Sequence, residues 1–518
     1  MSLDVERFRA IVAARLGLLF DDAKFGLLAE VLRRRIDASG AAPEVYLERL
    51  AAPQDSREEI GALAKELTVT ETYFFRNMEQ FRALVEIALP DRIGARQARR
   101  SLRFLSAGCA SGEEAYSLAA LVRQHLPEAA SWDVSIRGVD INAAMIQKAR
   151  RGRYSAWSLR ETPADLQRRW FREKGPEFLL DESVRSMVNF EERNLAEDNP
   201  SFWQPQTFDI IFCRNVLMYF VPETARAIVG RLSHALVPGG YLFLGHAENL
   251  RGLSQDFHLR HTHDTFYYQR KQGDADRPLP DIAPIAWTGA SSLPSAPLAL
   301  NAPLASVVEA ADSWVDAIRR AAERIQTLTE SRAALARSGP RTGDRSPAAH
   351  PRWDVELAVE LLRKERFAEA LALVRELPPE SADDPDVLLL RAVLLTQSGN
   401  LAEAEKVCAD LLALDDLNTG AHYLFAICRE GLGDRQGAFD HDQVAVYLDP
   451  GFAMPRLHLG LLARRAGERE AARRELGQAL VLLQREDASR VLLFGGGFSR
   501  DTLVSLCRAE LVACGGAP

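Results

Sequence analysis

Two acidic residues follow a small-residue turn within the segment 103–122. An apolar run leads into the turn Gly108–Gly112, and Glu113 and Glu114 come next, ahead of an amphipathic stretch. A strand, a glycine turn and a helix in this order form the first crossover of a nucleotide-binding α/β sheet. Carboxylates at the mouth of that helix repel phosphate, so the segment favours a cationic nucleoside without phosphate, such as S-adenosylmethionine (SAM). An ordinary βα turn that binds no ligand has the same pattern.

Polar side chains also follow two other segments with the pattern of strands. The alternating stretch VSIRGV ends at Asp140, 32 residues after Gly108. An acid at this place can accept hydrogen bonds from both hydroxyl groups of a ribose. The apolar stretch FDIIFC is followed by Arg214, Asn215 and Tyr219. Because parallel strands present their carboxyl ends to the ligands of α/β proteins, we expect these side chains to contribute to one site.

An arginine follows a cluster of aromatic residues in the stretch LTVTETYFFRN. Arg76 comes directly after Tyr73, Phe74 and Phe75. A guanidinium beside stacked rings forms a good pocket wall, although an aromatic patch that faces the core has the same pattern. The sequence contains no recognisable Ser/His/Asp set or metal-ligand set, and we interpret His246 as structural rather than as a base.

Three regions differ in their periodicity. Residues 1–90 show helical spacing, whereas strand-like and helix-like runs alternate over residues 91–270. We therefore expect a helical N-terminal domain followed by a Rossmann-like α/β domain with a mostly parallel sheet. Residues 154–195 interrupt the alternation and are expected to form a small inserted β-subdomain. Residues 271–351, rich in Pro, Ala and Ser, predict a linker with one amphipathic helix over about 306–337.

A repeat of 34 residues occupies the region 352–487. Small residues recur with this spacing, and the two clearest series are Ala370, Ala404, Ala438, Ala472 and Gly399, Gly433, Gly467. This period is typical of tetratricopeptide repeats (TPRs), in which helix pairs stack into an all-α solenoid. We expect the solenoid to bind a protein or peptide whose identity the sequence does not give. The tail 488–518 has no interpretation, because its glycines lack the strand–loop–helix context of a phosphate site.

Composition excludes several classes of protein. The 518 residues carry a net charge of -8, which disfavours nucleic-acid binding by the whole chain. Six scattered cysteines without a CxxC pair indicate reduced thiols rather than disulfides or a zinc site. The start MSLDVERF does not resemble a signal peptide, and no run of 18 apolar residues is present. We therefore expect a cytoplasmic protein without direct membrane insertion. The triplet Arg33–Arg35 fits a solvated face or a contact for an acidic partner.

Six longer motifs occur in a fixed order: VTETYFFRN, SAGCASGEEAYS, GVDIN, KARRGRY, FDIIFCRNVLMYF and GHAEN. Together they make residues 1–270 similar to the CheR-type chemoreceptor glutamate O-methyltransferases. The resemblance implies a SAM-binding α/β domain with an inserted β-subdomain. It also implies methylation of glutamate side chains on the cytoplasmic helices of a methyl-accepting chemoreceptor, giving γ-methyl esters in a chemosensory adaptation pathway. The protein would then be recruited to receptor arrays at the membrane.

The resemblance also assigns roles to individual residues. Tyr219 would lie near the transferred methyl group, and Arg76, Arg214 and Tyr219 would be the catalytic residues, with no metal. Thr70 stands where enteric members of the family carry asparagine. The inserted segment is also a few residues shorter than in those members, which resembles members that bind no receptor tether. The expected SAM contacts are Thr70, Thr72, Arg76, Glu114, Asp140, Asn194, Leu195, Arg214 and Asn215.

The chemistry explains why no general base is needed. A glutamate carboxylate, with an ordinary pKa of ~4.3, is already ionised at neutral pH. A sulfonium is a good leaving group, so alignment of the two reactants should dominate catalysis. The main alternative is a catalytically weak SAM-binding scaffold whose TPR region recruits signalling partners. Methylation of nucleic-acid amino groups is disfavoured, because Asn215 is followed by Val216-Leu217 rather than by Pro-Pro and an aromatic residue.

Overall fold

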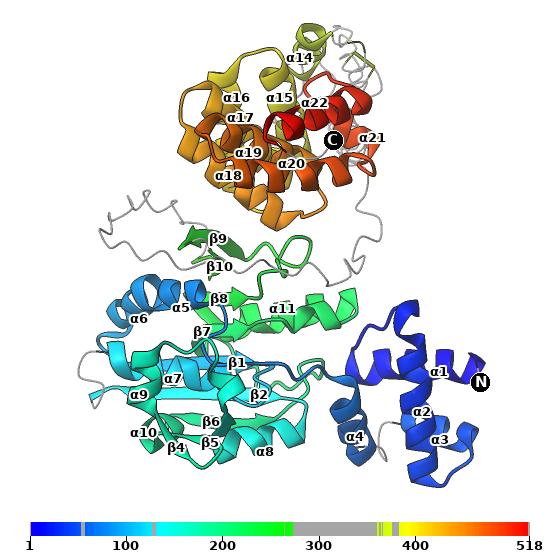
Figure 1. Cartoon of the computed structure of the whole chain (residues 1–518), viewed down its shortest axis with the longest axis vertical. Helices are drawn as coiled ribbons and strands as arrows, with labels where there is room; N and C mark the ends of the chain where they lie inside the picture. Colours follow the sequence, from blue (N-terminus) through cyan, green and yellow to red (C-terminus); the bar gives the residue numbers. More distant parts are fainter. Residues whose placement is uncertain are drawn as a thin grey trace, which may run out of the picture. The chain divides into compact units, whose positions relative to one another are not determined.

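The computed structural model describes residues 2–52, 57–126, 131–263, 265–272, 360–361, 364, 366–375 and 383–515. The chain divides into two compact units, Met1–Ala305 and Ser306–Pro518 (Figure 1). Most of the expected linker, including the expected amphipathic helix, lies outside the described residues. Within the described part of the chain, no helix is long and apolar enough to cross a membrane.

Four helices and a short 3-10 turn form the N-terminal part of the first unit. Ion pairs join the second helix to the fourth, because Arg35 lies 2.5 Å from Glu59 and Arg34 lies 2.8 Å from Glu66. Two arginines of the Arg33–Arg35 triplet are therefore used inside this domain. The elements are α1 (Ser2–Leu16), η1 (Asp22–Lys24), α2 (Phe25–Ser39), α3 (Pro43–Ala51) and α4 (Arg57–Leu67).

The next helices pack on the sheet rather than on the N-terminal helices. They are α5 (Met78–Ala83), the π-helical turn η2 (Leu84–Ala88) and α6 (Leu89–Arg96). Phe81 stacks on Phe212 of the sheet with ring centroids 5.7 Å apart, and Phe74 and Phe75 belong to the same core. The helical domain thus ends before Phe74 instead of near residue 90. Helical spacing predicts a helix but does not tell which surface covers its apolar face.

A seven-stranded mixed sheet in the order β6-β2-β1-β7-β8-β10-β9 forms the centre of the first unit. The first five strands are parallel, while β10 pairs antiparallel with β8 and β9. The Rossmann-like fold class expected from the alternating pattern is therefore confirmed. The strands are β1 (Ser101–Ala107), β2 (Asp133–Asp140), β6 (Val188–Glu192), β7 (Phe208–Cys213), β8 (Leu236–Leu244), β9 (Phe257–Thr262) and β10 (Thr265–Arg270). The main connecting helices are α7 (Glu113–His125), α8 (Ala143–Arg151) and α11 (Pro222–Ala235).

The small insertion contains a three-stranded sheet in the order β3-β5-β4. It ends at about Arg185 rather than at residue 195, because β6 pairs with β2 in the main sheet. Phe190 explains this placement, since its ring packs edge-on against Tyr116 of α7, with centroids 5.2 Å apart. The insertion consists of β3 (Arg153–Ser155), η4 (Ala156–Leu159), α9 (Ala164–Trp170), β4 (Phe171–Lys174), β5 (Glu177–Leu180) and α10 (Glu182–Arg185).

The second unit is all-helical, and its helix pairs repeat every 34 residues. The first helices of three pairs begin at Pro385, Thr419 and Ala453, and the second helices follow in the same register. Small residues allow the close packing, since a Cβ on Gly460 would come 2.6 Å from Leu476. This register confirms the expected TPR solenoid. The helices are α14 (Phe367–Arg375), α15 (Pro385–Gln397), α16 (Leu401–Leu414), α17 (Thr419–Gly431), α18 (Arg435–Leu448), α19 (Ala453–Ala466), α20 (Arg469–Leu483), α21 (Ala488–Phe494) and α22 (Arg500–Ala513).

Candidate active site

A cavity lies at the carboxyl ends of β1, β2 and β7, where ligands bind in open α/β sheets. Nine of the ten residues expected from the sequence line it. The exception is Thr70, which is described by the structure but is not among the lining residues; its neighbours Thr68, Val69 and Glu71 are. The nine are Thr72, Arg76, Glu114, Asp140, Asn194, Leu195, Arg214, Asn215 and Tyr219.

The turn after β1 depends on glycine. Gly108 has φ +74, and a Cβ on it would come 2.4 Å from the side chain of Val216. Its N–H and that of Cys109 donate to the Val139 carbonyl at 2.8 and 3.0 Å. These bonds hold the β1 turn against the end of β2, and the missing side chain lets the loop after β7 approach.

Asp140 lies in this cavity with its carboxylate held by two backbone amides. Oδ2 accepts from the N–H of Ala110 at 2.9 Å, and Oδ1 accepts from the N–H of Asn142 at 2.8 Å. Burial raises the pKa of Asp140, while these two hydrogen bonds oppose the rise. Each oxygen keeps further acceptor capacity. The carboxylate is thus fixed in orientation and can still accept from two neighbouring hydroxyl groups.

Arg214 is a buried cation beside the carboxylate of Glu114. Its Nε lies 3.5 Å from Oε2 of Glu114, and its Nη2 donates to the Arg76 carbonyl at 2.5 Å and to Oδ1 of Asn77 at 3.0 Å. Burial lowers the pKa of Arg214 and raises that of Glu114, and the attraction between the two charges opposes both shifts. Ser106 donates to the other oxygen of Glu114 at 2.7 Å.

Two nitrogens of Arg214 still lack an acceptor. Nε and Nη1 are buried and have no hydrogen-bond partner among the described residues. Buried donors without acceptors are costly, so a guanidinium in this state fits a ligand that carries a carboxylate. The amino-acid carboxylate of SAM can accept hydrogen bonds from these nitrogens. The ribose hydroxyls of SAM can donate to the carboxylate of Asp140. The residues present therefore fit this cofactor.

The other two expected catalytic residues, Arg76 and Tyr219, line the same cavity. The Arg76 guanidinium lies 5.7 Å from the centroid of the Tyr73 ring. Tyr219 is half-buried at the end of the short helix η5 (Leu217–Tyr219). Burial raises the pKa of Tyr219, so its hydroxyl is protonated at neutral pH and can donate a hydrogen bond.

The loop that carries Arg214 to Tyr219 is held by Glu248, a buried residue to which the sequence assigned no role. Its Oε2 accepts from the N–H groups of Asn215 at 2.6 Å and Gly245 at 2.7 Å. Its Oε1 accepts from the N–H groups of Val216 at 2.8 Å and Met218 at 3.3 Å. His246, two residues earlier, is exposed and does not line the cavity.

A loop of the N-terminal domain covers part of the cavity. Leu18 and Phe20 are among the lining residues. The Leu19 N–H donates to the Tyr219 carbonyl at 2.8 Å, and the Val221 N–H donates to the Gly17 carbonyl at 2.9 Å. Sequence reasoning missed this contribution, because the only local signal is an apolar run that continues the helical pattern of α1.

No cluster of three or more possible metal ligands occurs among the residues that the structure describes.

The family model described as "CheR methyltransferase, SAM binding domain" matches residues 70–266. The chain is 34% identical over 276 residues to chemotaxis protein methyltransferase 2 of Vibrio cholerae, a match covering 53% of this chain and 95% of that protein.

A second relative is similar to this chain over nearly the whole length of both proteins. The chain is 27% identical over 474 residues to the probable biofilm formation methyltransferase WspC of Pseudomonas putida, which covers 91% of this chain and 97% of that protein. Among solved structures, a thermophilic TPR protein of Thermus thermophilus is 23% identical, with a TM-score of 0.24, and the match covers 30% of this chain and 88% of that one.

Proposed function

The chain belongs to the CheR methyltransferase family, and from this premise we propose that it methylates glutamate side chains on the cytoplasmic helices of a chemoreceptor. The product would be a glutamate γ-methyl ester. Its cofactor is SAM, the ligand of the matched family domain. SAM supplies a methyl group on a sulfonium, a leaving group that needs no further activation.

The protein's own contribution is binding and alignment. We assign Asp140 to the ribose hydroxyls, because its carboxylate is fixed by two backbone amides and lines the cavity. We assign Tyr219 to the incoming carboxylate, because a protonated phenol can donate to one oxygen and leave the other as the nucleophile. The apolar residues of the N-terminal loop help to exclude water, which strengthens these polar contacts.

The single observation that carries the proposal is the arrangement of Arg214. Its charge faces the cavity, its orientation is set by Asn77 and the Arg76 carbonyl, and Glu114 partly compensates it. A second guanidinium, that of Arg76, lines the same cavity. Two cations attract a carboxylate and repel a protonated lysine. Because the two open nitrogens of Arg214 are assigned to the carboxylate of SAM, the incoming glutamate is attracted by this charge without pairing to it and remains nucleophilic.

Transfer of a tritiated methyl group from SAM to receptor cytoplasmic fragments tests this proposal. We expect label in the receptor fragment and its release as methanol in mild base, because an ester hydrolyses and an N-methyl group does not. Receptor fragments with the candidate glutamates changed to alanine are the matched control. SAM binding without any transfer would instead support the SAM-binding scaffold.

The contribution of the Arg214 guanidinium to methyl transfer can be tested separately with two variants. Arg214→Lys keeps a positive charge but loses the planar fork, and Arg214→Ala loses both. We expect transfer to fall in both variants and further in Arg214→Ala. Equal transfer by all three proteins would remove Arg214 from the site.

A further inference from the structure

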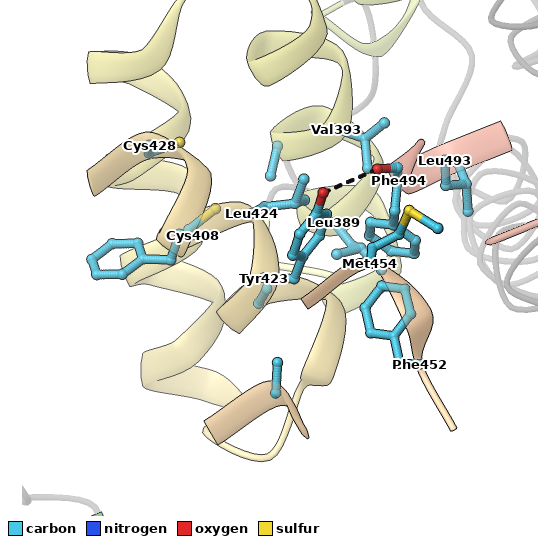
Figure 2. Close-up of a cluster of buried hydrophobic side chains, with 14 of the residues drawn as sticks. Leu389, Val393, Cys408, Tyr423, Leu424, Cys428, Phe452, Met454, Leu493 and Phe494 are labelled. Atoms are coloured by element: carbon cyan, nitrogen blue, oxygen red, sulfur yellow. Dashed lines mark hydrogen bonds between the residues drawn. The ribbon is translucent and has the colours of Figure 1, made fainter. Parts of the chain in front are cut away.

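The last two residues of the short helix α21 contact the first helices of two repeats, α15 and α17. Figure 2 shows Leu493 and Phe494 of α21 in one cluster with Tyr423 of α17 and Leu389 of α15. Leu493 is 2% exposed and Phe494 is 3% exposed. In solenoids of paired helices, the first helices line the concave face that binds partners. The end of α21 therefore lies on the face formed by the first helices, which we call the groove.

Phe494 packs against two aromatic rings of this groove. Its ring centroid lies 5.2 Å from that of Phe452 and 6.1 Å from that of Tyr423. A Cβ on Gly420 would come 2.8 Å from the tip of the Phe494 ring. The equivalent positions one repeat earlier and later carry Asp386 and Met454. Glycine thus stands at a repeat position where a side chain would exclude the aromatic ring.

Groove side chains also hold the main chain of the segment. Nε2 of Gln397 donates to the Leu493 carbonyl at 3.0 Å, and the Tyr423 hydroxyl donates to the Phe494 carbonyl at 3.3 Å. These carbonyls lie at the end of a helix of seven residues, where the helix itself supplies no N–H for them. In one common mode of peptide recognition, hydrogen bonds to main-chain groups give affinity and pockets for side chains give specificity.

An ion pair also joins the α21 segment to the solenoid. Arg490 lies 2.5 Å from Asp449 and 3.3 Å from Glu486, and its guanidinium lies 5.2 Å from the centroid of the Phe452 ring. Asp449 belongs to the turn between the second and third described pairs, so the groove supplies a carboxylate for a basic side chain four positions before the aromatic anchor.

Helix α22, which follows α21 in the chain, packs on another part of the solenoid. After α21, Gly496 and Gly497 adopt positive φ values of 64° and 82° and redirect the chain. Helix α22 then packs on α20, where Cys507 donates to the Leu476 carbonyl at 3.1 Å. Because α22 has contacts of its own with α20, displacement of α21 does not require α22 to move.

We propose that the segment Asp487–Phe494 is an intramolecular occupant of a peptide-binding groove that must be displaced before the solenoid binds its partner. The partner is a protein segment with the same chemistry, namely an apolar residue next to an aromatic one, with a basic residue four positions earlier. A tethered occupant competes at an effective concentration of ~1 mM, so it weakens the apparent affinity of every partner for the open groove.

A labelled peptide with the sequence of residues 486–498 serves as the probe. We expect the full-length Phe494→Ala protein to bind it at least tenfold more tightly than the unaltered protein, because its own segment no longer fills the pocket. Phe498→Ala is the matched control, since Phe498 lies in the same tail but is 56% exposed. The control should bind the probe as weakly as the unaltered protein. A probe with alanine in place of its first phenylalanine should not bind to any of them.

Equal affinity of all three proteins for the probe would overturn the proposal. Hydrogen exchange on the unaltered protein gives a second test that needs no variant. We expect the amides of α21 to exchange at least tenfold faster than those of α20 and α22, because α21 opens by itself. If the three helices exchange together, α21 is a fixed part of the solenoid and the proposal is wrong.

Discussion

Replacing Glu248 by glutamine tests how the active-site loop is held. The carboxylate of Glu248 accepts four backbone N–H groups, three of them from the loop that carries Arg214 and Tyr219. Its side chain is buried, and burial raises its pKa while the four donors oppose the rise. The change Glu248→Gln keeps the size of the side chain and replaces one oxygen by an NH2 group.

The expected loss of stability in Glu248→Gln follows from the two pairs of N–H donors that face the carboxylate. One pair points at Oε1 and the other at Oε2, so whichever oxygen the amide keeps, two N–H groups face a donor. Each buried N–H left without an acceptor costs ~1–3 kcal/mol, so two of them lower the free energy of unfolding by about 2–6 kcal/mol. Because the strain lies in the loop itself, we also expect weaker SAM binding and slower methyl transfer.

Urea unfolding measures this effect, and the transition that SAM shifts to higher urea identifies the methyltransferase unit. Glu223→Gln is the matched control, since Glu223 is exposed in the first turn of α11. We expect the control to change stability by less than ~0.5 kcal/mol. If Glu248→Gln is as stable as the control and transfers methyl groups at the same rate, the loop does not depend on this carboxylate.

Four further predictions concern the site and the solenoid. Asp140→Ala should weaken SAM binding by ~1–3 kcal/mol in calorimetry, through the lost ribose hydrogen bonds, and unchanged binding would remove Asp140 from the site. Tyr219→Phe should lower kcat more than it weakens SAM binding, and a proportional loss of both would contradict its assigned place near the methyl group. The carboxylates of Asp442, 2.6 Å away, and Glu430, 2.9 Å away, raise the pKa of His458 to about 9 against the effect of its burial, and burial raises the pKa of Asp442 to about 6. The carboxylate is ionised in both folded and unfolded chains above pH 7, so the solenoid should lose stability as the pH rises from ~6.5 through 9, and urea midpoints that stay constant over this range would refute the ion pair. A version ending at Lys271 should bind SAM and methylate receptor fragments at high concentration but signal poorly in cells, and full signalling would show that the solenoid is dispensable.

Residues at the ends of strands could be assigned from the sequence alone. Asp140 and Arg214 follow apolar runs that read as parallel strands, and the carboxyl ends of such strands meet at one edge of the sheet. The 34-residue period likewise predicted the register of the helix pairs, because each pair must bury its apolar face against the next one.

Contacts between distant segments could not be predicted in this way. The position of Leu19 against Tyr219 depends on how the N-terminal domain meets the sheet, and its apolar neighbours only continue a helical pattern. The role of Glu248 depends on backbone N–H groups that lie about thirty residues earlier, so it follows from the fold and not from residue type. The place of Phe494 depends on Gly420, a residue without a side chain to signal a pocket.

The identity of the methylated atom tests the central claim most directly. After incubation with SAM, a receptor cytoplasmic fragment can be digested and its modified peptides sequenced by tandem mass spectrometry. We expect a mass gain of one methylene on a glutamate side chain, present before and absent after treatment with mild base. A methyl group on lysine, arginine or asparagine, or a base-stable methyl group on any residue, would contradict the proposal that this chain is a glutamate O-methyltransferase.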